Sequence, residues 1–202
     1  MVNLLTKTEP INGYIDGFEY NPLAEIRHVR NWDIGNFNSK PEPNKKKLFA
    51  HDFHDMISIF QDICFALFQS QYIYCTYFPA TALDKTLYRY RHNSIYQDTV
   101  RQLYKKGFRP SSKKRYSILL DHPFEIDIFN EEELLRSLIK CTMYDIGSFC
   151  FINDLETIAI TSTHHMAYYL YFKETFIYDI LINKISPRYP QINIQKMENI
   201  LK

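Results

Sequence analysis

Glycine is scarce in this chain, with 5 among 202 residues. Loops that cradle phosphate groups need several glycines, because a backbone without Cβ atoms can approach a phosphate closely. The sequence contains no G-x-G-x-x-G, no P-loop and no G-x-S-x-G pattern. These absences argue against dinucleotide-binding, NTP-hydrolysing and α/β-hydrolase functions, and the sequence indicates no cofactor.

Cysteine pairs with metal-binding or redox spacing are also absent. No C-x-x-C pair occurs, and each of the four cysteines lies in an apolar run (Cys64, Cys75, Cys141 and Cys150). Cysteines of this kind behave as small buried hydrophobic side chains in a reducing compartment.

Long hydrophobic runs are missing as well. No apolar run reaches the length of about 18 residues that a membrane-spanning helix needs. The start of the chain, "MVNLLTKTEP", has no extended apolar segment of the kind found in secretory signals. We therefore expect a soluble cytoplasmic protein without a membrane partner.

Net charge is low and aromatic content is high. The formal net charge of +1 creates no overall field that would favour nucleic acid or an acidic partner. Aromatic residues make up 16%, with 16 tyrosines and 15 phenylalanines. Tyrosine combines apolar contact area with a polar tip, which is typical of hydrated protein interfaces. The alternative is that these residues only fill the core.

Residues 51–69 carry the clearest helix pattern. Apolar side chains recur there at i, i+3, i+4 and i+7, which predicts a helix with one wide buried stripe. The β-rich segment that follows ends before Pro79, so we expect a strand over 72–78. Residues 80–93 are expected to be helical.

The next helix has recognisable ends. Ser94 and Gln97 fit an S-x-x-Q capping box at its start. Lys105 and Lys106 suit the negative end of the helix dipole, and Gly107 suits the position just after the helix. We therefore expect a helix that begins at Ser94 and ends before Gly107.

The second half of the chain alternates short strands with helices. Asn130 fits the N-cap of a helix with three glutamates in its first turn, and Asn153 with Asp154 fits a tight turn. The other expected elements are strands over 115–121, 124–129, 148–152, 156–161 and 166–172, a helix over 174–185 and a short last helix in the tail. Hairpin-like connections dominate, so we predict an α+β fold with several helices packed on a mainly antiparallel sheet.

Residues 1–47 differ in composition from the rest, with three glycines and four prolines. We expect an irregular N-terminal arm here, with a short strand or helix at 23–29 and a solvated linker at 40–47. Trp32 is expected to anchor the arm on the body. Residues 48–202 are expected to form a single α+β domain.

Two adjacent histidines, His164 and His165, stand between two predicted strands. Neighbouring side chains in a strand point to opposite faces, so these two imidazoles would not bind one ion together. A metal or catalytic role would need a loop there and acidic partners such as Asp121 or Asp127. We favour a corner of the sheet.

A second group of polar residues lies in "HDFHD". His51 and Asp55 are spaced i, i+4 on the predicted helix, with His54 close to them, and this spacing can present metal ligands. The same residues lie opposite the apolar stripe, together with Ser58 and Asp62, where a polar surface is ordinary. We favour the polar surface and keep a metal-dependent enzyme at this segment as a third hypothesis.

Opposite charges are segregated along the chain. Residues 101–115 carry seven Lys or Arg and no acid, whereas residues 121–133 carry six acids and no Lys or Arg. The basic segment has interleaved aromatic residues and could follow nucleic-acid phosphates. The acidic segment could cover the basic cleft of a nuclease. The alternative is that the two segments are neighbours in space and neutralise each other.

Two resemblances to known families bear on these segments. The stretch "LYKKGFRPSSKKRYSILLDHPFEIDIF" resembles the helix–Gly-Phe–strand–strand layout of nucleotidyltransferase-like domains. Their Gly-Ser with paired acids is absent, so no catalytic role is assigned to Asp127. The stretch from "IDIFNEEELLRSL" through "FCFINDLETIAITSTHHMAYYLYF" resembles immunity proteins of bacterial contact-dependent and polymorphic toxin systems, in which a helix precedes a hairpin and "T-H-H" precedes another strand.

The second resemblance implies a non-enzymatic protein that binds one cognate toxin domain, often a nuclease, and blocks its active site. Acidic side chains would pair with cationic groups of the toxin, and tyrosines would serve as anchors. The residues expected to bind the toxin are Asp121, Glu125, Asp127, Glu131, Glu132, Glu133, Tyr169 and Tyr171. The alternative is a nucleic-acid-binding or nucleotidyltransferase-like protein that uses Lys105, Lys106, Arg109, Lys113, Lys114 and Arg115.

Overall fold

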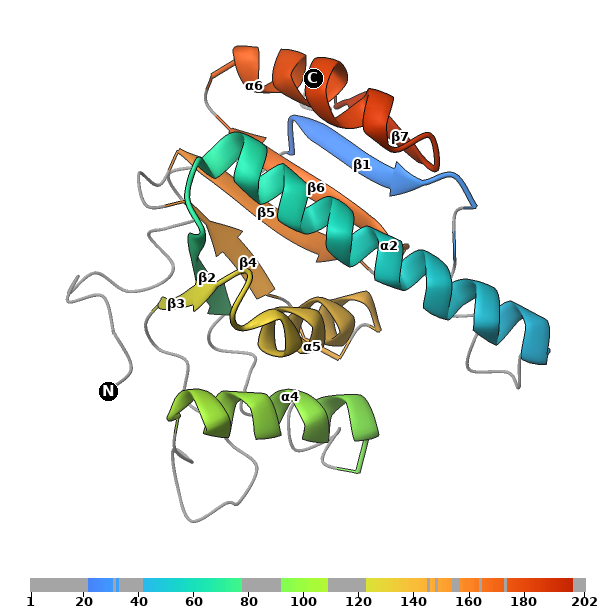
Figure 1. Cartoon of the computed structure of the whole chain (residues 1–202), viewed down its shortest axis with the longest axis vertical. Coiled ribbons are helices and arrows are strands. Elements are labelled where there is room, and N and C mark those ends of the chain that lie inside the picture. The colour runs from blue at the N-terminus through green and yellow to red at the C-terminus, as the bar shows by residue number, and fades with distance from the viewer. Residues whose placement is uncertain are drawn as a thin grey trace, which may run out of the picture.

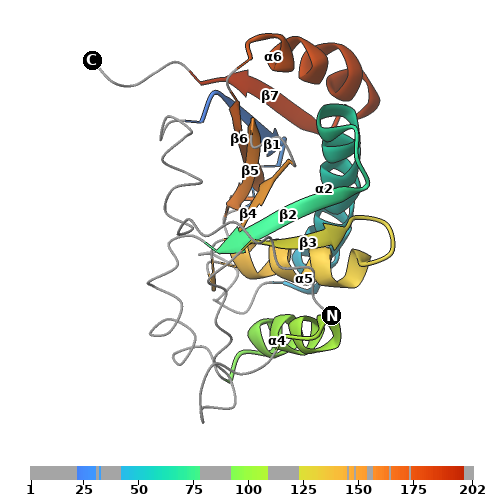
Figure 2. The ribbon, with the colours of Figure 1, turned by 90° about the vertical axis from the view of Figure 1, so that its left-hand side faces the viewer.

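The computed structural model describes residues 22–30, 32, 42–77, 92–108, 123–144, 146–147, 149–153, 157–163, 165–172 and 174–197. In these residues helices pack on one face of a seven-stranded sheet, which confirms the predicted α+β class (Figures 1 and 2). The strand predicted over 115–121 lies outside the described residues, as does the helix predicted over 80–93 apart from its last two positions.

The sheet is antiparallel at every pairing of its strands, as predicted. Its order is β3-β2-β4-β5-β6-β1-β7. The strands are β1 (Ala24–His28), β2 (Tyr72–Tyr77), β3 (Phe124–Asp127), β4 (Phe149–Ile152), β5 (Ile158–Thr163), β6 (Ala167–Phe172) and β7 (Ile192–Lys196). Strands β2 to β6 confirm the five predicted strands that fall within the described residues.

The helices are α2 (Pro43–Phe68), α4 (Ser94–Lys106), α5 (Glu132–Met143) and α6 (Phe176–Ile180), and α6 continues as the π-helical turn η3 (Leu181–Ile185) and the 3-10 turn η4 (Ser186–Arg188). Helix α4 packs on α5, where the Thr99 hydroxyl donates to the Ser137 carbonyl at 3.1 Å. None of the helices described in the structure is both long and apolar enough to cross a membrane.

Helix α2 buries the apolar stripe that its sequence predicts. The Phe60 ring lies 4.9 Å from the ring of Phe151 on β4 and 5.2 Å from the ring of Tyr168 on β6. The Tyr168 hydroxyl donates to the Met56 carbonyl at 2.8 Å, so the polar tip of this buried tyrosine has a hydrogen-bond acceptor on the helix. The helix begins at Pro43, whose fixed φ suits a first helical position. The predicted linker at 40–47 is therefore wrong for residues 43–47, which are helical.

The two faces of the sheet differ in character because side chains alternate along each strand. The face toward α2 carries the buried apolar residues, for example Phe151, Ile160 and Leu170, which are paired across β4, β5 and β6. The opposite face carries a smaller buried cluster of Cys150, Ile152 and Ala159, against which Tyr171 packs. The other residues of this face are mostly tyrosine, threonine and charged residues (Tyr74, Glu125, Thr161, Tyr169, Glu25 and Arg27).

Segments from both halves of the chain form one end of the sheet, where β1 lies beside β6 and β7 lies beside β1. Strand β1 confirms the strand alternative for 23–29, but it lies inside the sheet, between β6 and β7, rather than in a separate arm. The core that contains Ala24 and Ile26 continues into α2, which runs across residue 47. The short helix predicted in the tail is wrong for 192–196, which form β7; residues 198–202 lie outside the described part.

The caps of α4 and α5 differ in part from the predicted ones. Asn93, not Ser94, caps α4: its Oδ1 accepts from the backbone N–H groups of Ile95 at 2.9 Å and Tyr96 at 3.2 Å. Gly107 ends the helix as predicted, at φ 108°, a conformation that favours glycine. Asn130 does not cap α5, because the helix begins at Glu132 and the N-cap position is therefore Glu131.

Candidate functional site

Asp127 organises the turn between β3 and α5. Its carboxylate accepts from the backbone N–H groups of Phe129 at 3.0 Å and Asn130 at 2.9 Å, and from the Asn130 side chain at 2.8 Å. Burial alone would raise the pKa of Asp127, but the hydrogen bonds from Asn130, Phe129 and Gln71 outweigh it and hold the pKa below its usual value. Asn130 is thus used in this turn, which is why it does not cap the helix.

The three glutamates after this turn pair with basic residues of α4 and α5. Glu131 accepts from Lys106 and also from the Asp127 backbone N–H at 2.9 Å. Glu133 accepts from Gln102 at 3.1 Å and lies 3.5 Å from the Lys105 ammonium.

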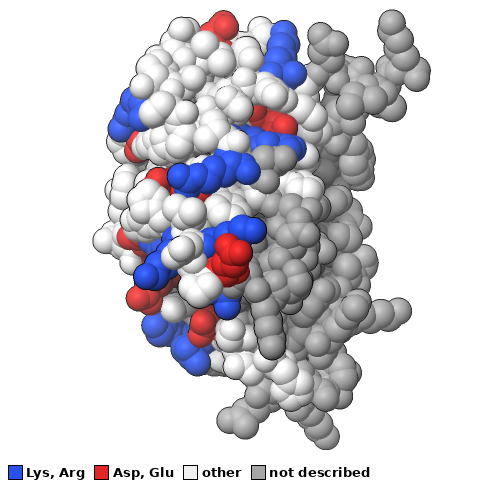
Figure 3. Space-filling model, turned by 90° about the vertical axis from the view of Figure 1, so that its right-hand side faces the viewer, with Lys and Arg blue, Asp and Glu red and all other residues white. Residues whose placement is uncertain are grey.

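Glu132 pairs with Arg136 at 2.8 Å, one turn along α5. Within the described residues, the acidic and basic segments are therefore neighbours that partly neutralise each other. Acidic and basic side chains are likewise interspersed over the face shown in Figure 3.

These glutamates line a hollow of about 330 Å³ between the end of α4 and the start of α5. Its lining consists of Gln102, Lys105, Lys106, Phe129, Asn130, Glu131, Glu132, Glu133 and Leu134. The hollow therefore offers one aromatic side chain, three carboxylates and two ammonium groups to a binding partner.

An exposed aromatic pair lies at the edge of this hollow. Phe65 of α2 is 58% exposed and Phe129 is 54% exposed, and their ring centroids are 6.0 Å apart in an edge-to-face arrangement. The Gln61 side chain donates to the Ile128 carbonyl at 2.9 Å, which fixes the turn against α2. We refer to Phe65, Phe129 and the start of α5 (residues 131–134) as the Phe65–Phe129 surface.

The other predicted partner-binding residues lie elsewhere or outside the described part of the chain. Tyr169 and Tyr171 are on β6 and Glu125 is on β3, all on the sheet face away from α2. Strands β3 and β6 are four positions apart in the sheet, a distance of roughly 19 Å. Asp121 is not among the described residues, and the same holds for Arg109 and residues 113–115 of the basic segment.

Tyr169 has charged neighbours on that second face. It lies opposite Glu25 of β1, which is ion-paired with Arg27. Burial raises the pKa of Tyr169, and the Glu25 carboxylate adds to the rise. Burial also raises the pKa of Tyr171. Both tyrosines therefore remain neutral hydrogen-bonding groups near neutral pH.

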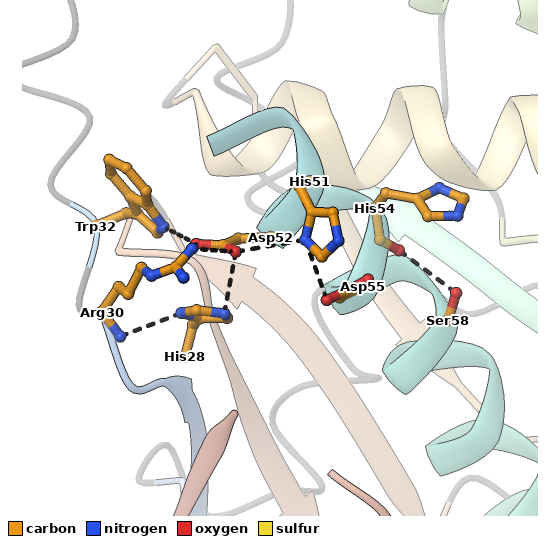
Figure 4. Close-up of polar contacts among 8 residues, drawn as sticks. All are labelled: His28, Arg30, Trp32, His51, Asp52, His54, Asp55 and Ser58. Carbon is orange, nitrogen blue, oxygen red and sulfur yellow. Dashed lines mark hydrogen bonds and ion pairs between the residues drawn. The ribbon is translucent and has the colours of Figure 1, made fainter. Parts of the chain in front are cut away.

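A buried carboxylate, Asp52, joins the end of β1 to α2 (Figure 4). It is 3% exposed and accepts from the Arg30 guanidinium at 2.7 and 2.8 Å and from the Trp32 indole N–H at 2.7 Å. The Trp32 ring also lies edge-on to Phe49, with centroids 5.6 Å apart. The predicted role of Trp32 as an anchor is confirmed, and Asp52 is its partner.

His28 completes this cluster. Its Nδ1 accepts from the Arg30 backbone N–H at 3.1 Å, so the proton of the neutral ring sits on Nε2, which lies 3.6 Å from Asp52. Burial lowers the pKa of His28 below its usual 6.5, and Arg30 adds to this, although Asp52 opposes it. Both ring nitrogens have partners, so the imidazole holds the fold together rather than offering a free base.

The "HDFHD" residues do not converge on one point. His51 lies 3.4 Å from Asp55, whereas His54 points away from them (Figure 4). The His54 ring lies 3.0 Å from the Arg136 guanidinium. No group of three metal-ligating side chains comes together in the part of the chain that the structure describes. His51, His54 and Asp55 form part of the polar surface of α2, as favoured from the sequence, whereas Asp52 of the same segment is buried.

The second histidine pair lies at a hairpin. Strands β5 and β6 pair up to Thr163 and Ala167, and His165 and Met166 lie in the turn between them. Met166 there has φ 54°, and the His165 backbone N–H donates to the Thr163 hydroxyl at 3.3 Å. His165 thus lies at the predicted corner of the sheet; His164 is not among the described residues.

Comparison of the chain with protein-family models, with curated proteins and with solved structures gives no match. The function is therefore argued from the geometry.

The sequence reasoning missed Phe65, Phe129 and Asp52, although each leaves a signal. Phe65 falls outside the buried stripe of α2, and Phe129 sits among polar residues in a turn. Asp52 is in phase with the buried Phe49 and Met56, which is where a charge must have partners.

Proposed function

We propose that this protein binds another protein through the Phe65–Phe129 surface and acts as an immunity protein that neutralises a bacterial toxin. The observation that carries the proposal is the contact between two exposed phenylalanines from separate elements, beside a carboxylate-lined hollow. The likeness of the C-terminal half to immunity proteins supplies the class of partner.

Exposing an aromatic pair to water costs free energy, and covering the pair at an interface recovers it. A single exposed apolar residue is ordinary, but a contiguous apolar patch with a polar rim is typical of binding sites. Covering the exposed parts of both rings contributes on the order of 2 kcal/mol, and such central anchors dominate interface energies. The surrounding glutamates supply the polar rim.

The proposed mechanism is occlusion of the toxin's active site. A nuclease carries a basic cleft for the phosphates of its substrate. Glu132 and Glu133 lie exposed beside the aromatic pair and present carboxylates to such a cleft. Their charge speeds association and selects the partner, while the rings hold the complex together.

Co-expression with a candidate toxin, identified by its co-purification with this protein, tests the proposal. The wild-type chain is expected to restore growth to cells that produce the toxin. The double variant Phe65→Ala/Phe129→Ala is expected to lose this protection, because truncation of two central anchors weakens binding by about a hundredfold or more.

Phe176→Ala provides the matched control. Phe176 is 53% exposed on α6 and does not line the hollow, so its removal should leave protection intact. Loss of protection by both variants, or by neither, would contradict a role for the Phe65–Phe129 surface. The folded state of each variant is checked by thermal unfolding.

A further inference from the structure

We propose that proton uptake by His28 opens the segment after β1 and releases Trp32 from Asp52, so that this end of the molecule responds to pH (Figure 4). Asp52 and Phe65 are 13 residues apart on α2, roughly 20 Å along the helix. The switch is therefore separate from the Phe65–Phe129 surface and does not depend on the proposed function.

The His28 ring can take a second proton only by giving up a hydrogen bond. Its Nδ1 accepts from the Arg30 backbone N–H at 3.1 Å, and an imidazole with protons on both nitrogens has no acceptor. The residue is 2% exposed, so water does not replace the lost partner while the segment is closed. The protonated ring would face the Arg30 N–H donor to donor, which favours a shift of the backbone at Arg30.

The charges that act on the ring come from α2 and from the segment after β1, and they are Asp52, Asp55, His51 and Arg30. The neighbours of His28 in the ladder, Met166 before β6 and Ile192 of β7, carry no charge. Asp52 favours the protonated ring, but one nitrogen of the Arg30 guanidinium already donates to both of its oxygens, at 2.7 and 2.8 Å. Burial has the largest effect and holds the pKa of His28 below its usual 6.5 in the closed arrangement.

Trp32 shares its acceptor with Arg30. The indole N–H donates to the Asp52 carboxylate at 2.7 Å, so a shift of the backbone at Arg30 reaches the indole two residues further on. The indole also lies edge-on to the buried ring of Phe49, with 5.6 Å between the centroids. Release of Trp32 therefore removes cover from Phe49 and adds apolar surface at the start of α2.

The proton balance gives the direction of the switch. In the open arrangement His28 has its usual pKa near 6.5, which is higher than in the closed one, so opening takes up a proton. Opening becomes more favourable as the pH falls from about 6.5 toward the closed-state pKa, by at most about tenfold per pH unit for one group. Well above pH 6.5 the ring is neutral in both arrangements, and pH no longer affects the opening.

Hydrogen exchange of the Trp32 indole N–H, followed by NMR, tests the proposal. The chain has one tryptophan, so this N–H gives a single indole signal. Its protection factor is the exchange rate of a free indole divided by the rate in the protein at the same pH. We expect this factor to fall about threefold or more between pH 7 and pH 5.5. A protection factor that does not fall overturns the inference.

The backbone amides of β6 show whether the opening is local. Strand β6 is paired on both sides, so its amides exchange only when the sheet opens. We expect them to be at least about tenfold better protected than the indole N–H at pH 7. Equal protection would mean that Trp32 is released only by unfolding of the whole protein, and this result overturns the inference.

Two histidine variants identify the group that takes up the proton. His28→Asn keeps an acceptor near the position of Nδ1 but does not titrate, so the indole protection factor should no longer change with pH. His51→Asn is the matched control, because His51 also lies beside Asp52, at 3.7 Å, but its side chain is 73% exposed. This variant should keep the wild-type pH dependence. Persistence of the pH dependence in His28→Asn, or its loss in His51→Asn, overturns the inference.

Discussion

Asp52 shows how one residue can fix the path of a chain. It stands where the helix pattern calls for an apolar side chain, and burying a carboxylate without partners would cost several kcal/mol. Arg30 and Trp32 bring their donors to it from the segment after β1. The charge is therefore what positions this segment on α2, and a hydrophobic replacement would leave Trp32 and His28 without their acceptor.

His28 makes the stability of this cluster depend on pH. Because its pKa is lower in the folded protein than the usual 6.5, the unfolded chain binds more protons near pH 6. The contribution of neutral His28 is complete above about pH 6.5 and is lost as the pH falls toward the folded pKa. We predict that the free energy of unfolding falls between pH 7 and pH 5 with a slope of up to about 1.4 kcal/mol per pH unit from this group.

Urea denaturation at several pH values measures this slope. The His28→Gln variant should show a shallower dependence than the wild type. A His28→Gln variant with the wild-type slope would show that His28 does not titrate differently in the folded and unfolded states.

At the scale of elements, α4 offers a direct comparison of two candidate caps. The sequence favours Ser94, but Asn93 accepts the two backbone N–H groups at the helix start. We predict that Asn93→Ala lowers the free energy of unfolding by about 1 kcal/mol, the usual value of an N-cap. Ser94→Ala should change it by less than about 0.5 kcal/mol. Equal losses in the two variants, measured by chemical denaturation, would contradict the assignment of the cap.

Some elements could be predicted because their local signals are strong. Three signals leave few alternative conformations: the long apolar period of α2, the β-rich apolar runs of β4 to β6, and the glycine after α4. Helix caps were placed one residue away, because asparagine and serine both cap well and only the folded turn decides between them. Strand β7 was missed because a short helix was expected in the tail, and the pairing that makes it a strand is with β1, far away in the sequence.

The candidate site was predictable only in part for a related reason. Glutamates at 131–133 stand out in the sequence as a run of charge, and they do line the hollow. The approach of Phe65 to Phe129 joins residues 64 positions apart, and no local pattern contains that pairing. Tyr169 and Tyr171 were predicted to bind the partner together with the glutamates, because tyrosine is common at interfaces. They lie instead on the sheet face away from α2.

At the scale of the whole molecule, the strand order separates two potential binding regions. The Phe65–Phe129 surface lies where α2 meets the turn after β3, the edge strand at one end of the sheet. Tyr169 and Tyr171 of β6 lie far from that edge, on the face away from α2. A partner of ordinary interface size, about 800 Å² on each side, would be centred on one of these regions, not on both.

Hydrogen exchange of the complex with the neutralised toxin locates the binding surface. We predict that binding slows amide exchange at the end of α2 and over residues 128–134, and leaves β6 unchanged. Slower exchange around Tyr169 and Tyr171, with no change near Phe65 and Phe129, would contradict it.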